Sequence, residues 1–122
     1  MKTTQNLLTM SETQRLHNEA MSKANEAFTA QKAGDNIKYL ALTKEAFEKE
    51  KTAAWQLFTK TEAEPTRSVL FRSAAWLAFN CGKIRESEQL ISAAIAGNPP
   101  IEILKELRTL YREVLQSLEP TT

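Results

Sequence analysis

The apolar residues along the chain recur at helical spacing, and nowhere do they alternate with polar residues as in a strand. Turn and capping signals divide the pattern into five predicted helices, over residues 11–33, 36–60, 65–81, 83–96 and 101–118. The third helix is apolar on most sides, which is typical of a helix that is buried on most sides. We expect Leu70, Ala74, Leu77 and Ile91 to be buried together. The pattern predicts an all-α fold with the third helix at its centre.

Short polar signals mark where the predicted helices begin and end. Ser11 and Gln14, or alternatively Thr9 and Glu12, form a capping box, so the first helix is expected to begin near Ser11 and residues 1–10 to form a flexible tail. The residues suited to end, cap or start the other helices are Gly34, Asp35 or Asn36, Pro65, Gly82, Gly97, Pro99 and Pro100. Residues 11–119 are therefore predicted to form a single helical domain.

Composition narrows the classes of protein that fit this pattern. The 122 residues suit one domain, and a hydrophobic content of 42% is enough for a core. Sixteen basic and fifteen acidic side chains nearly cancel, which disfavours a nucleic-acid or anionic-membrane partner. Cys81 is the only cysteine, so no intramolecular disulfide can form. There is no secretory signal and no apolar run of membrane-spanning length. We expect a soluble, cytoplasmic protein.

The segment over residues 71–99 resembles a tetratricopeptide repeat. The matching residues are Phe71, Ala74, Ala75, Gly82, Ile84, Ser87, Ile91, Ala94 and Pro99. The earlier hairpin matches at fewer positions, with Tyr39 where alanine is usual, and Gly34 and Gly82 are 48 residues apart; the usual repeat has about 34. The last half of the chain also resembles small uncharacterised bacterial proteins of this type. The resemblance implies a right-handed stack of antiparallel helical hairpins with a C-terminal capping helix.

In tetratricopeptide proteins, ligands usually lie along the first helix of each hairpin. The positions that match this face are Met21, Phe28, Gln31, Val69, Arg72, Trp76, Phe79 and Asn80. An arginine flanked by aromatic residues is typical of interface hot spots. The alternative is that Trp76 and Phe79 pack in the core, as most helical aromatics do. The family's clamp for C-terminal carboxylates is not expected, because Phe28 and Trp76 replace its asparagines. The leading hypothesis is an adaptor that binds another protein or peptide.

The last helix supports a second hypothesis. Leu104, Leu107, Tyr111, Val114 and Leu118 follow the alternating three- and four-residue spacing of a helix-packing seam. Ile103 and Leu110 make this apolar stripe wider than a capping helix needs. If these two side chains remain partly exposed, they offer a surface for a homodimer. The alternative function is therefore a self-associating structural module that uses this helix and the long second helix.

Residues with catalytic or metal-binding chemistry are sparse. His17 is the only histidine and has no cysteine near it in the sequence, so it cannot build a zinc site. Cys81 ends the most apolar helix and is expected to be a small core residue. The sequence contains neither a Glu-x-x-His pair nor a glycine-rich phosphate loop. We expect no catalytic, metal-binding or cofactor-binding residues, and hence no enzyme.

Overall fold

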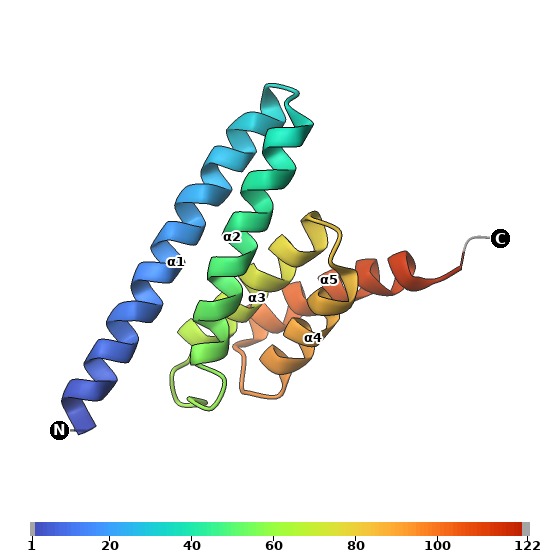
Figure 1. The fold of residues 1–122 in the computed structure, drawn as a ribbon. Coiled ribbons are helices and arrows are strands. Elements are labelled where there is room, and N and C mark those ends of the chain that lie inside the picture. Colours follow the sequence, from blue (N-terminus) through green and yellow to red (C-terminus); the bar gives the residue numbers. More distant parts are fainter. Residues whose placement is uncertain (1, 121–122) are drawn as a thin grey trace.

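The computed structural model describes the backbone of residues 2–120 and the side chains from Glu12 onward. This part of the chain contains five helices and no strand (Figure 1). The helices are α1 (Lys2–Lys32), α2 (Asn36–Gln56), α3 (Thr66–Asn80), α4 (Ile84–Ile95) and α5 (Ile101–Leu118). The predicted all-α class is confirmed. Among the described residues, no helix has the length and apolarity needed to cross a membrane.

The turns within the two hairpins form as the sequence predicts. Gly34 and Gly82 have φ angles of 80° and 84°, a conformation that costs glycine little and other residues more. The carboxylate of Asp35 accepts a hydrogen bond of 3.0 Å from the Lys38 amide at the start of α2. Between the two candidate caps, Asp35 is therefore the one that caps α2.

Two predicted helix boundaries are wrong. α1 begins at Lys2 rather than near Ser11, because no glycine or proline precedes Gly34 and the helix is not forced to start at the capping box. Met1 of the predicted tail lies outside the described residues. α2 ends at Gln56 rather than near Lys60, and a series of tight turns follows it.

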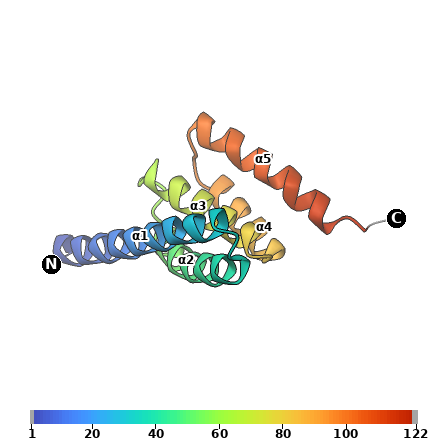
Figure 2. The same ribbon diagram turned by 90° about the horizontal axis from the view of Figure 1, so that it is seen from above.

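The helices pack as two hairpins with α5 laid over the second (Figures 1 and 2). The closely packed pairs are α1 with α2, α2 with α3, α3 with α4, and α5 with both α3 and α4. Small side chains allow α3 and α4 to approach, and the Ser87 hydroxyl donates a hydrogen bond of 2.8 Å to the Ala75 carbonyl. Leu70, Ala74 and Ile91 are buried together as predicted, but Leu77 is only half-buried.

The two α5 residues named for self-association do not meet the condition of partial exposure. Ile103 is only 7% exposed and Leu110 is fully buried. Both lie on the side of α5 that faces α3 and α4, together with Leu107 and Val114. They therefore belong to the core and offer no surface for a second copy in this conformation. The apolar stripe is wide, as predicted, but its exposed part lies on other residues.

A buried arginine joins α3 to the end of α4. Arg67 is 1% exposed, and its guanidinium donates hydrogen bonds to the carbonyls of Phe58 (3.0 Å), Ala93 (3.0 Å) and Ala94 (3.4 Å). The same group stacks over the rings of Phe58 and Phe71. The last carbonyls of a helix carry partial negative charge, which a cation stabilises. Arg67 therefore caps α4 and fixes the loop that follows α2.

The loops around Arg67 are fitted to it. A Cβ added at Gly97 would overlap the Arg67 guanidinium, so only glycine leaves it room. The Glu64 carboxylate accepts hydrogen bonds from the amide and hydroxyl of Ser68 (3.0 and 2.8 Å) and from the Asn98 amide (3.2 Å). The α2–α3 loop and the α4–α5 loop are thus tied to each other.

Candidate functional site

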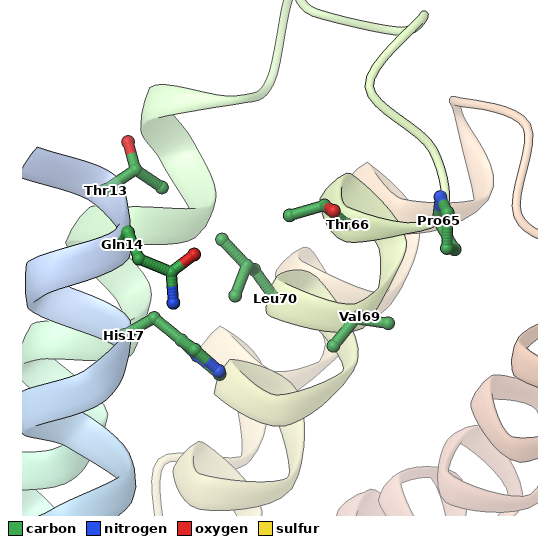
Figure 3. A pocket seen from close by; sticks show the side chains of 7 residues that line it. All are labelled: Thr13, Gln14, His17, Pro65, Thr66, Val69 and Leu70. Carbon is green, nitrogen blue, oxygen red and sulfur yellow. The ribbon is translucent and has the colours of Figure 1, made fainter. Parts of the chain in front are cut away.

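Two recesses open between α1 and α3, which are not among the closely packed helix pairs. The first has a volume of about 230 Å³ and is lined by Thr13, Gln14, His17, Pro65, Thr66, Val69 and Leu70 (Figure 3). The second has a volume of about 160 Å³ and is lined by Ala24, Ala27, Phe28, Gln31, Tyr39, Thr43, Leu77 and Asn80. We call these fifteen residues the α1–α3 face.

The two recesses lie on one side of the same two helices. On α1, residues 13, 17, 24, 28 and 31 are separated by three, four or seven positions, which places them along one helical stripe. On α3, residues 66, 70, 77 and 80 follow the same rule, and residue 69 lies three positions from 66 on the same side of the helix. Because the lining residues share one stripe of α1 and one stripe of α3, the two recesses follow each other along these helices.

Four of the sequence-predicted binding residues line these recesses. Phe28, Gln31 and Asn80 come together at the second recess, and Val69 lines the first. Phe28 is 56% exposed, more than the other exposed aromatic side chains, Trp55, Phe58 and Tyr111. Met21 is half-buried on α1 and lines neither recess.

The other predicted binding residues are engaged within the molecule. Arg72 forms an ion pair of 3.0 Å with Glu106 of α5. The rings of Trp76 and Phe79 meet edge to face with centroids 6.3 Å apart, and both are half-buried against the core. Arg72, Trp76 and Phe79 thus lie beside α5 or the core rather than in the recesses.

A buried acid–base pair lies beside the first recess, and no local pattern in the sequence predicts it. Glu50 of α2 is fully buried, and Nδ1 of His17 lies 2.9 and 3.0 Å from its two carboxylate oxygens. Burial raises the pKa of Glu50 to about 7, while hydrogen bonds from His17 and the Ser73 hydroxyl act to lower it. Three helices therefore contribute to one proton-binding group.

The chemistry open to this face is recognition by hydrogen bonds and apolar contact. The His17 ring points from α1 toward α3 (Figure 3), and because Nδ1 faces Glu50, Nε2 is the nitrogen left for a ligand. Glu50 itself is too deeply buried to touch one. Burial raises the pKa of the Cys81 thiol, which keeps it protonated and a poor nucleophile. In the described part of the chain, no three acidic, histidine or cysteine residues cluster as metal ligands would.

Comparison with known proteins adds no relative: no family model, no curated protein and no solved structure matches the chain. Function is therefore inferred from the side chains of the α1–α3 face.

Proposed function

We propose that the protein is a non-enzymatic adaptor that binds another protein or peptide along its α1–α3 face. The observation that carries this proposal is the alignment of two recesses between α1 and α3, with an exposed phenylalanine at one of them. Successive recesses along one line suit a polypeptide segment, which presents a side chain at regular intervals. A small rigid ligand would fill only one of them.

The lining of the recesses favours an uncharged segment. Among the residues whose side chains the structure describes, no Lys, Arg, Asp or Glu lines either recess. Gln14, Gln31 and Asn80 carry amides, which both donate and accept hydrogen bonds as a peptide backbone requires. Val69 and Leu77 supply apolar surface beside them. A segment with apolar side chains and little charge fits this combination of groups.

The proposal includes a tetratricopeptide-like arrangement. Two helical hairpins turn at glycines with positive φ, and α5 covers the second hairpin as a capping helix does. The first helices of these hairpins are α1 and α3, and both recesses lie between them. This is the side that tetratricopeptide proteins use for ligands. The length of α1 and α2 makes the first hairpin longer than the second (Figure 1).

Replacing Phe28 with serine should reduce capture of the partner from extracts of the native host at least about tenfold, as loss of an aromatic anchor does. The protein should stay folded, because Phe28 is more than half exposed. Quantitative mass spectrometry of proteins retained by the immobilised full chain measures the loss, and far-UV circular dichroism checks the fold.

The matched control is Ile37→Ser, which removes an apolar side chain that is 86% exposed and lines neither recess. Its set of captured proteins should equal that of the wild type. Equal capture by wild type and Phe28→Ser, or equal losses in both variants, would remove the support for this face.

A further inference from the structure

The apolar surface of α5 is wider than the area that α3 and α4 cover. An inner row is buried against these helices and consists of Ile103, Leu107, Leu110 and Val114. An outer row lies beside it and consists of Leu104, Tyr111, Leu115 and Leu118. Leu104 is half-buried, and the other three side chains are between 37% and 40% exposed. The outer row thus leaves a stripe of large apolar side chains in contact with water.

The outer row continues onto α4. A recess of about 380 Å³ between the two helices is lined by Ile91, Ser92, Ile95, Ala96 and Tyr111. Ile95 is 45% exposed, although it ends a helix whose other large apolar side chains face the core. We call the outer row and Ile95 together the α4–α5 surface. Tyr111 and Ile95 border the recess, so this surface joins a stripe on α5 to a hollow between two helices, into which a side chain of a third helix can pack.

Basic side chains follow the outer row on its solvent side. Lys105, Arg108 and Arg112 are all exposed, and none forms an ion pair within the described part of the chain. At about 100° per residue they lie roughly a quarter turn from the outer row. Acidic side chains of α5 lie on the opposite side, where Glu106 pairs with Arg72. Within α5, the free edge of the apolar stripe is therefore basic, and Glu119 follows it at the C-terminal cap.

We propose that the α4–α5 surface binds an amphipathic helix of another protein, whose apolar stripe covers the outer row and whose acidic residues face Lys105, Arg108 and Arg112. The outer row is spaced at seven, four and three residues, which is the spacing of a helix-on-helix seam. The stripe from Leu104 to Leu118 is about 21 Å long at 1.5 Å per residue, which is most of the length of α5. An amphipathic helix can match the length and the residue spacing of the outer row, and it can carry acidic side chains along the edge that faces the basic residues.

A second copy of α5 packed antiparallel does not provide the charges that complement this surface. In an antiparallel pair related by a twofold axis, like edges of the two helices lie on the same side. Arg108 and Arg112 of each copy would then face the basic edge of the other, and like charges placed together at an interface are strongly unfavourable. In an antiparallel pair, an acidic edge therefore has to come from a different chain.

This second interface does not depend on the α1–α3 face. In both views α5 leads away from α1 and α2 toward the C-terminus (Figures 1 and 2). No residue of the α4–α5 surface lines either recess of the α1–α3 face. Either interface can therefore fail its test while the other passes.

Two synthetic helical peptides of about 18 residues, long enough to cover α5, provide the probe. They share one leucine stripe and carry either glutamate or lysine along the same edge. The full-length protein should bind the glutamate peptide at least about tenfold more tightly, and added salt should reduce this difference. The Arg108→Glu/Arg112→Glu variant should reverse the preference. Isothermal titration calorimetry measures the affinities.

The matched control is Lys38→Glu/Lys44→Glu, which makes the same change in net charge on exposed residues of α2. It should keep the wild-type preference. Leu115→Ser should reduce the affinity for the glutamate peptide at least about tenfold while the protein stays folded by circular dichroism, because the side chain is 40% exposed and lies outside the buried inner row. Equal affinity for the two peptides, or a control that also reverses the preference, would overturn the proposal. So would a dimer in sedimentation equilibrium that Leu115→Ser dissociates, because a second copy would then occupy the surface.

Discussion

Replacing Arg67 with methionine should lower the free energy of unfolding by about 3–5 kcal/mol, among the larger effects expected of a single substitution. Methionine fills part of the space but donates no hydrogen bonds, so the carbonyls of Phe58 and Ala93 lose this donor, whereas the Ala94 carbonyl keeps the Gly97 amide at 3.1 Å. A buried acceptor left without a partner costs about 1–3 kcal/mol. Urea denaturation monitored by circular dichroism gives the free energy directly.

The control is Arg85→Met, which removes a guanidinium whose side chain is 75% exposed and which pairs with Glu88 across one turn of α4. Such surface pairs contribute at most about 1 kcal/mol. Gly97→Ala should also destabilise the protein, because its methyl group would displace the guanidinium of Arg67. If Arg67→Met cost no more than Arg85→Met, the assignment of Arg67 as the cap that joins α3 to α4 would be wrong.

Stability should fall as the pH rises from 5 to 8, and Glu50→Gln should remove most of this fall. Burial raises the pKa of Glu50 from 4.5 to about 7. The folded protein therefore holds this proton more tightly than the unfolded chain does. The resulting stabilisation is complete below about pH 4.5 and is lost as the pH rises through 7. A difference of this size corresponds to about 3 kcal/mol.

Urea denaturation of wild type and Glu50→Gln at several pH values isolates this effect, because His17 and Ser73, the groups that face the carboxyl, remain in both proteins. The hydrogen bond and the charge of His17 act to lower the pKa of Glu50, so His17→Asn should steepen the pH dependence. Parallel stability profiles for wild type and Glu50→Gln would contradict the assigned burial of this carboxyl.

Local signals in the sequence were enough to predict the class and most of the helix boundaries. Gly34 and Gly82 require positive φ whatever surrounds them, and Asp35 caps a helix through its own backbone neighbourhood. The helical period likewise belongs to each segment by itself. The start of α1 was missed because a capping box permits a helix to begin but does not prevent it from extending toward the N-terminus.

The two buried charges could not be predicted, because their environments are assembled from distant parts of the chain. Glu50 stands between Lys49 and Lys51, a pattern typical of a solvated helix face, and its burial depends on α1 and α3. Arg67 occupies the first turn of α3, where an exposed side chain is usual, and its acceptors come from the α2–α3 loop and the end of α4. Neither the burial of Glu50 nor the hydrogen bonds of Arg67 can be read from the residues next to them in the sequence.

The sequence also does not determine how each helix is rotated about its own axis, and hence which of its apolar side chains face the core. The period of α5 predicts a wide apolar arc, but the arc alone does not determine which part of it faces α3 and α4. Ile103 and Leu110 belong to the inner row and are buried, whereas Tyr111 and Leu115 belong to the outer row and are exposed. On α3, Leu77 is half-buried for a similar reason, since α1 does not pack closely against that side.

Site-specific photocrosslinking in the native host tests the α1–α3 face most directly. A photoreactive phenylalanine analogue replaces Gln31 in the second recess, Thr66 in the first, or Thr52 on the exposed side of α2. If one polypeptide segment runs along the face, Gln31 and Thr66 should each give an adduct with the same partner, and Thr52 should give none. Adducts from Thr52 alone, or none from Gln31 and Thr66, would contradict the proposed binding face.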